Sequence, residues 1–235
     1  MRNVLVRTAS GIVYIVLMVA AVFTPWVAVP LALFFIIAGL YEFYKLCKAS
    51  TLHKNFAFWL IVGLLWIVLP LSVLFLLWVP QSPAQVLAFL ILIWMSDTAA
   101  YVFGSLFGKH KLAPSISPGK TWEGFLCSCV FTVGLAVGLS YIPYFDMGMP
   151  LWGWMVFALV IQVFGLIGDL TESLLKRKAG VKDSGNIIPG HGGVLDRVDS
   201  ILFATVPVWL FCLMCWELRH SCRENINKPH IIPTF

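Results

Sequence analysis

The sequence predicts an all-α, polytopic integral membrane protein with about seven transmembrane helices in a single domain. Of its 235 residues, 60% are hydrophobic and only 11% are charged. Soluble domains, by contrast, are about 45–50% apolar and about 25% charged. A transmembrane helix takes about 20 apolar residues, so the hydrophobic residues suffice for about seven spans. The apolar runs are continuous rather than alternating, which excludes a membrane β-barrel.

The apolar runs divide into seven helical segments. The first run is too long for one span and contains Pro25 and Pro30, which divide it into two helices. We expect a kink near Pro70 in the third helix and a polar loop between the fourth and fifth. The predicted helices cover residues 8–24, 27–46, 56–78, 84–107, 122–142, 151–176 and 199–218.

The positions of lysine and arginine predict which segments face the cytoplasm. The net charge is +5, and the basic residues gather at the N-terminus and in the loops after the second, fourth and sixth helices. By the positive-inside rule, these segments are cytoplasmic, so the charge marks topology and we expect no nucleic-acid partner. Seven spans leave the basic tail on the opposite side, either as an exception or because one segment is re-entrant. The tail carries Arg219, Arg223 and Lys228.

The acidic residues divide the chain into two parts. The first 95 residues hold one acidic residue, Glu42, whereas the remainder holds ten. We therefore predict N-terminal helices without a chemical motif at 1–95 and a catalytic region at 96–200. Two cytoplasmic loops, 108–121 and 177–198, belong to the catalytic region. The two parts show no internal repeat of the kind that many transporters carry.

Three carboxylates of the second part stand out because they fall within apolar helices, at or near membrane depth. Asp97 lies near the middle of the fourth helix, and Asp169 and Glu172 share one face of the sixth. A carboxylate in hydrocarbon costs about 3 kcal/mol or more on insertion scales, so such residues face a wet cavity, a partner or an ion. Gly168, just before Asp169, would let a ligand or metal approach closely.

Two of these carboxylates could instead have structural roles, without contact to a ligand or an ion. Glu172 could form an ion pair with Lys176, four residues further along the same helix. Asp97 could accept hydrogen bonds from its neighbours Ser96 and Thr98. Either role would satisfy a charge in the membrane without a ligand.

Residues 176–200, KRKAGVKDSGNIIPGHGGVLDRVDS, combine basic side chains, glycines and a closing acidic pair, Asp196 and Asp199. Carboxylates bind hard cations, basic side chains neutralise phosphates and glycines admit a phosphate to the backbone, so this composition suits phosphoryl chemistry. The alternative is a glycine-rich turn before a helix that Asp196 or Asp199 caps. The 108–124 loop offers Ser117 and Lys120 as further phosphate contacts, without the spacing of a Walker loop.

These segments resemble a known family. SLLKRKAGVKDSGNIIPGHGGVLDRVDS, residues 173–200, is similar to the signature of phosphatidate cytidylyltransferases, also called CDP-diacylglycerol synthases. SDTAAYVFG and KLAPSISPGKTWEG are also similar to segments typical of that family, so the resemblance covers about residues 96–200. Many bacterial members are longer and have more membrane helices. The residues on fixed signature positions are Ser173, Lys176, Arg177, Lys182, Asp183, Gly185, Pro189, His191, Gly192, Gly193, Asp196, Arg197 and Asp199.

The resemblance implies an enzyme that transfers the cytidylyl group of CTP to phosphatidic acid. It implies Mg²⁺ as cofactor, leaves a second cation open, and assigns Asp169 and Asp196 as main metal ligands, with Asp199 and Asp97 in support. Lys176 and Arg177 would act in catalysis together with Asp169 and Asp196. The implied substrate-binding residues are Ser173, Lys182, Asp183, His191, Gly192, Gly193, Arg197, Lys120 and Ser117.

The resemblance also implies a location and partners. We expect a multi-pass protein of the bacterial inner membrane, surrounded by membrane lipids, with the active site facing the cytoplasm. A homodimer is one assembly that stays open. The rival functions are a CDP-archaeol synthase, a polyprenol or phytol kinase, and an ion or proton transporter that uses the intramembrane carboxylates as its pathway.

Overall fold

The computed structural model describes residues 2–50, 55–188 and 192–227. All seven predicted helices are present, although the last begins at Leu195 rather than at residue 199. The helices are α1 (Arg2–Phe23), α2 (Pro25–Ala49), α3 (Phe56–Gly63), α4 (Leu69–Ser72), α5 (Val79–Gln81), α6 (Pro83–Phe107), α7 (Trp122–Ser140), α8 (Leu151–Lys178) and α9 (Leu195–Asn227). The π-helices η2 (Leu64–Val68) and η3 (Val73–Trp78), the 3₁₀ helix η4 (Pro143–Phe145), and the strands β1 (Lys111–Ala113) and β2 (Ser117–Thr121) complete the described elements.

Within the part of the chain that the structure describes, six segments are long and apolar enough to cross a membrane, which confirms a polytopic helical membrane protein. The apolar part of α1, Thr8–Phe23, is shorter than the other six. The prediction of about seven spans therefore corresponds to six candidate spans and one shorter helix. The six are Pro25–Ala49, Phe58–Gln81, Pro83–Phe107, Trp122–Ser140, Leu151–Lys178 and Leu195–Arg219.

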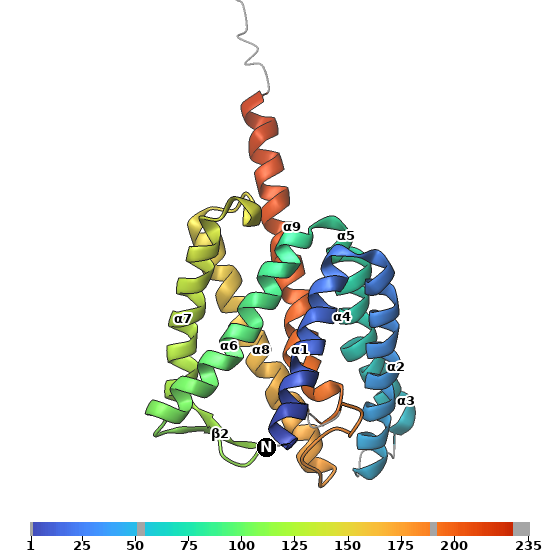
Figure 1. Ribbon diagram of the computed structural model, residues 1–235. Helices are drawn as coiled ribbons and strands as arrows, with labels where there is room; N and C mark the ends of the chain where they lie inside the picture. Colours follow the sequence, from blue (N-terminus) through green and yellow to red (C-terminus); the bar gives the residue numbers. More distant parts are fainter. Residues whose placement is uncertain (1, 51–54, 189–191, 228–235) are drawn as a thin grey trace, which may run out of the picture.

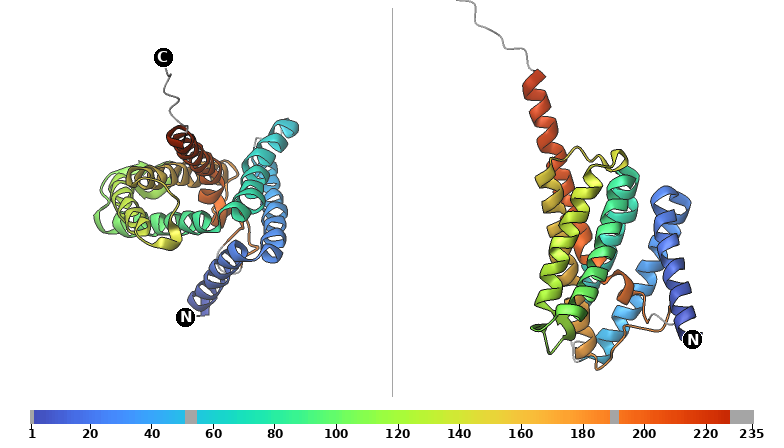
Figure 2. Two further views of the ribbon diagram at one scale, coloured as in Figure 1. Left: turned by 90° about the horizontal axis from the view of Figure 1, so that it is seen from above. Right: turned by 60° about the vertical axis from the view of Figure 1, so that its left-hand side comes forward.

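The helices form two neighbouring groups. The first group consists of α6, α7, α8 and α9, each packed against the next. The segments from α1 to α5 form the second group and pack along one side of the first (Figures 1 and 2). The N-terminus, the β1–β2 hairpin and the connection between α8 and α9 lie at one end of the bundle, which we call the loop end (Figure 1).

The far end of α9 projects from the opposite end of the bundle (Figure 1). There the Arg219 side chain packs over Gly148, in the connection between α7 and α8. Arg219 thus lies at the end of the bundle opposite to the loop end, apart from the other clusters of basic residues.

Pro70 lies in a helical segment with two π-helical stretches. It belongs to α4, between η2 and η3. Proline lacks an N–H group and its ring clashes with the carbonyl four residues earlier, so the helix must adjust around it. Here the adjustment takes the form of wider turns on both sides, and the segment continues to Gln81.

Glycines allow the closest helix crossings, as is common in membrane proteins. A Cβ at Gly124 would lie 2.7 Å from the Ala100 carbonyl oxygen, so α7 lies directly against α6. A Cβ at Gly168 would lie 3.0 Å from Phe203 Cβ and would also meet the Asp199 carbonyl. The expectation that Gly168 admits a ligand is wrong, because α9 fills that space.

This crossing predicts a contrast between two glycine substitutions. Gly168→Ala should lower the free energy of unfolding by about 1–3 kcal/mol, since the added methyl group must push α8 from α9. Gly134→Ala, in α7, is the control because a Cβ there meets nothing within 4 Å. The alanine should be neutral or should stabilise by under about 1 kcal/mol. Thermal unfolding of the purified proteins in one detergent measures both, and equal midpoints would contradict the close crossing.

Candidate functional site

A polar cavity of about 740 Å³ lies at the loop end. Residues of α6, the hairpin, α8 and α9 line it, so both predicted loops contribute to one site. Among the predicted site residues, Gly192 and Gly193 lie outside the lining, and His191 lies outside the described residues. The predicted residues in the lining are Asp97, Ser117, Lys120, Asp169, Ser173, Lys176, Arg177, Lys182, Asp183, Asp196, Arg197 and Asp199.

The β1–β2 hairpin forms one wall of this cavity. Its two strands pair antiparallel, and Thr121 at the end of β2 caps α7 by accepting a hydrogen bond from Gly124 N at 3.2 Å. Glu123 accepts hydrogen bonds from the backbone of Lys109 and His110, which closes the base of the hairpin. The sequence predicts only a polar loop here, so the hairpin is a feature that the structure adds.

Two contacts connect the hairpin to α8. Lys120 Nζ lies 2.5 Å from Asp169 Oδ2, and Arg177 Nε donates to the Ile116 carbonyl at 3.2 Å. Ser173 Oγ donates to the other oxygen of Asp169 at 3.2 Å. The structure thus brings Lys120, Asp169 and Ser173 together although about 50 residues separate the first two along the chain.

Lys176 lies between two buried carboxylates. Its Nζ is 2.6 Å from Glu172 Oε2 and 2.5 Å from Asp196 Oδ1. The exposed fractions of the three side chains are 12% for Lys176, 1% for Glu172 and 6% for Asp196. The structure therefore contains the ion pair considered for Glu172 and adds Asp196 to it.

Asp196 organises the connection between α8 and α9. Its Oδ2 accepts hydrogen bonds from Ser184 N at 3.0 Å and from Gly193 N at 2.8 Å. Gly192 has a φ of +83°, which favours glycine and turns the backbone toward Asp196. Because α9 begins at Leu195, Asp196 and Asp199 both lie within the helix. The alternative in which one of them is the residue that caps the helix is wrong.

Glu42 of α2 takes the capping role instead. Its Oε1 accepts from Val194 N at 3.0 Å and its Oε2 from Leu195 N at 2.9 Å, which satisfies two donors at the start of α9. This role of Glu42 is not predictable from the sequence pattern, because more than 150 positions separate Glu42 from its partners. The one available signal was a single carboxylate in a half of the chain otherwise free of acidic residues.

Asp97 and Asp199 face the cavity without a close basic partner. Within the described residues, neither lies within 4.0 Å of a lysine or arginine nitrogen. The hydroxyls of Ser96 and Thr98 donate to the carbonyls of Ile93 and Trp94, so the structural role considered for Asp97 is wrong. Asp199 Oδ1 accepts a hydrogen bond from Ser200 N at 2.8 Å, and both carboxylates line the cavity that a cation or a ligand would enter.

The donor set fits a hard cation such as Mg²⁺, although the described residues contain no ready cluster of three or more ligands. Carboxylate oxygens are the ligands that Mg²⁺ prefers, and Asp97, Asp169 and Asp199 line the same cavity. Glu172 Oε1 beside them is buried and has no hydrogen-bond partner among the described groups. A buried oxygen of this kind needs compensation, which a bound cation would supply.

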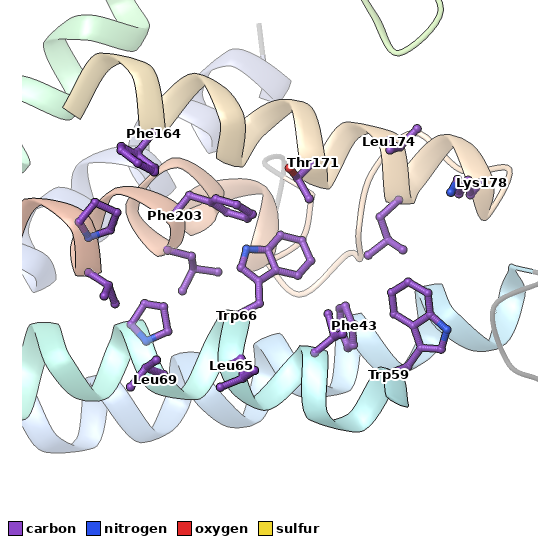
Figure 3. A pocket seen from close by; sticks show the side chains of 16 residues that line it. Phe43, Trp59, Leu65, Trp66, Leu69, Phe164, Thr171, Leu174, Lys178 and Phe203 are labelled. Carbon is purple, nitrogen blue, oxygen red and sulfur yellow. The ribbon is translucent and has the colours of Figure 1, made fainter. Parts of the chain in front are cut away.

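A second cavity, of about 540 Å³, lies on another face of α8 and differs in chemistry (Figure 3). Trp59, Trp66 and Phe203 project into it, and Lys178 lies at one end (Figure 3). Its lining includes no carboxylate. Acidic and basic side chains therefore meet in the polar cavity, and the apolar cavity offers a surface suited to hydrocarbon.

The fold and the site define a polytopic membrane protein in which oppositely charged side chains gather in a cavity at one end of the bundle. The chain belongs to the Cytidylyltransferase family, whose sequence profile matches residues 62–215. This match confirms the family to which the signature pointed.

Three curated relatives, all named phosphatidate cytidylyltransferase, are similar in sequence to this chain. The chain is 50% identical over 116 residues to the protein from Staphylococcus saprophyticus, 51% over 116 residues to that from Staphylococcus aureus and 52% over 120 residues to that from Staphylococcus epidermidis. Each alignment covers 49% of this chain and 44% of the relative. The aligned part thus spans less than half the length of these relatives.

The burial of Lys176 predicts unequal effects for two lysine substitutions. Lys176→Met leaves Glu172 and Asp196 without their cation and should lower the free energy of unfolding by about 3 kcal/mol. Lys120→Met breaks a more exposed pair, with side chains 24% and 33% exposed, and should lower it by under about 1 kcal/mol. Chemical unfolding in a single detergent compares them. A larger effect of Lys120→Met would contradict the central place of Lys176.

Proposed function

We propose that this protein transfers the cytidylyl group of CTP to phosphatidic acid, giving CDP-diacylglycerol and pyrophosphate. The observation that carries the proposal is the polar cavity, where six basic and six acidic side chains face one another at the end of membrane-spanning helices. Such a site suits two polyanionic substrates, one of them a lipid. The names of the curated relatives support the same reaction.

The reaction requires alignment and charge compensation more than a protein nucleophile. A phosphate oxygen of phosphatidic acid, already anionic, attacks the α-phosphorus of CTP, and the bond from that phosphorus to the pyrophosphate oxygen breaks. No covalent enzyme intermediate is needed. The Ser173 hydroxyl, which donates to Asp169, is therefore assigned to positioning rather than to attack.

The basic residues of the cavity divide into two kinds. Arg177, Lys182 and Arg197 are exposed in the cavity lining, and they would contact the phosphates of the substrates directly. Lys176 is held by two carboxylates, so it would act by keeping the local charge balanced. Lys120 and Ser117 would approach the substrates from the hairpin.

Asp97, Asp169 and Asp199 are the residues that would hold Mg²⁺, and Asp196 stays among the predicted ligands through the oxygen that faces Lys176. When bound, Mg²⁺ supplies positive charge that offsets the substrate phosphates. Asp183 and the two glycines at 192 and 193 remain predicted substrate-binding residues, as does His191.

The location follows from the distribution of basic residues. We propose that the loop end faces the cytoplasm in a bacterial inner membrane, because the basic segments gather at that end. The phosphate of phosphatidic acid would then enter the cavity from the membrane interface. A homodimer is one assembly that the proposal leaves open.

A direct assay tests the reaction. The purified protein should form CDP-diacylglycerol from CTP and phosphatidic acid with Mg²⁺, and should form none with EDTA or with ATP in place of CTP. Label from the α-phosphate of CTP should enter the lipid. Transfer of γ-phosphate label would instead establish a lipid kinase, and no product from folded protein with any lipid would overturn the proposal.

Substitutions test the acidic site. Asp169→Asn, Asp196→Asn and Asp199→Asn should each lower kcat by about 100-fold or more, since each removes a negative charge that the reaction uses. Asp146→Asn is the control, because Asp146 is exposed in the connection between α7 and α8, at the opposite end from the cavity. Near-normal turnover in the first three variants, with equal amounts of folded protein, would refute the assigned roles.

A further inference from the structure

Glu42 connects the half of the chain without a motif to the proposed reaction site. It lies on α2, in the group of helices that packs beside α6–α9 (Figures 1 and 2). Its side chain does not line the polar cavity. Glu42 is nevertheless only 1% exposed, and it contacts Ser184, which follows the lining residue Asp183 and contacts the lining residue Asp196.

Three donors converge on the Glu42 carboxylate. The backbone N–H groups of Val194 and Leu195 donate to it at 3.0 and 2.9 Å. The Ser184 hydroxyl lies 3.0 Å from Glu42 Oε2 and 3.0 Å from Asp196 Oδ2, and donates its one hydrogen to either oxygen. A carboxylate suits this position because it offers acceptors only. It also lies at the positive end of the α9 dipole.

Two glycines of the signature make room for this carboxylate. A Cβ at Gly185 would meet Glu42 Oε1 and would lie 2.9 Å from Glu42 Cδ. A Cβ at Gly193 would lie 2.6 Å from Glu42 Oε2 and 2.7 Å from Gly185 N. Both positions therefore need glycine for the approach of α2, independently of any contact that their backbone makes with a substrate phosphate.

The contacts form a continuous polar path from α2 to α8. Glu42 contacts Ser184, Ser184 contacts Asp196, Asp196 contacts Lys176, and Lys176 contacts Glu172. Asp196 and Lys176 line the polar cavity, and so do Lys182 and Arg197 next to the anchored backbone. Movement of the start of α9 would therefore displace groups on both sides of that cavity.

We infer that Glu42 is a positioning residue for cytidylyl transfer: its carboxylate holds the start of α9 and the Ser184 region in the place where the basic side chains beside them meet substrate phosphates. The inference rests on the proposed function for its kinetic part. Its structural part, the anchoring of α9 by α2, is independent of the substrate.

The first experiment measures the anchoring directly. Hydrogen exchange of the full-length protein in nanodiscs should show faster exchange of the Val194 and Leu195 amides in Glu42→Gln, with α6 and α7 unchanged. Glutamine provides one acceptor and an NH₂ donor, so it cannot accept from all three groups. Glu217→Gln, which removes a charge from an exposed position of α9, is the matched control and should not change the exchange. Unchanged exchange in Glu42→Gln would overturn the inference.

The second experiment measures kinetics. Glu42→Gln should raise KM for CTP about fivefold or more, because the phosphate-binding side chains are no longer held in place. A loss of folded protein alone would lower the rate at every CTP concentration and leave KM unchanged. An unchanged KM with accelerated exchange would show that Glu42 serves folding only, and would overturn the positioning role.

A second variant and the exchange measurement keep the inference testable if Glu42→Gln does not fold or if the wild-type protein is inactive. If Glu42→Gln does not fold, Ser184→Ala removes the hydroxyl between Glu42 and Asp196 with little change in size, and the same two measurements apply. If the wild-type protein forms no CDP-diacylglycerol, the proposed function fails, whereas the exchange measurement still decides whether Glu42 anchors α9.

Discussion

The structure of the site depends on the compensation of buried charge around Lys176. One ammonium group serves a carboxylate from its own helix and another from α9, at the ends of helices that otherwise bury apolar side chains. Either carboxylate alone would be strongly unfavourable in such surroundings. The requirement fixes α8 against α9 and directs the second oxygen of Asp196 toward the backbone of the connection between them. The wall of the polar cavity thus follows from one electrostatic constraint.

The faces of α8 differ in what they contact. Gly168 lets the backbone of α9 approach closely, just above the level where the charged side chains meet. On the polar side, Asp169 contacts Lys120 of the hairpin and accepts a hydrogen bond from Ser173. Away from it, Leu174 and Phe164 face the apolar cavity between α8 and the helices that precede α6 (Figure 3). One helix therefore separates a cavity suited to phosphates from one suited to hydrocarbon.

The sequence predicted the helices well because long apolar runs report membrane burial directly. It also predicted most of the residues that meet, since the charged residues of the signature line one cavity together with Asp97 and Asp169. The hairpin escaped prediction because residues 111–121 contain two prolines and lack an alternating apolar pattern. The role of Glu42 was missed and the role of Gly168 was predicted wrongly. Both roles depend on partners from distant helices, which periodicity does not reveal.

The pairing of Glu172 with Lys176 also bears on how the protein enters the membrane during synthesis. Helices are made in order, so α8 reaches the bilayer before the residues of α9 that will contact it exist. A glutamate and a lysine one turn apart neutralise each other within a single helix, which lowers the cost of placing either in hydrocarbon. α8 therefore carries its own counter-ion until Asp196 arrives and converts the pair into a bridge between two helices.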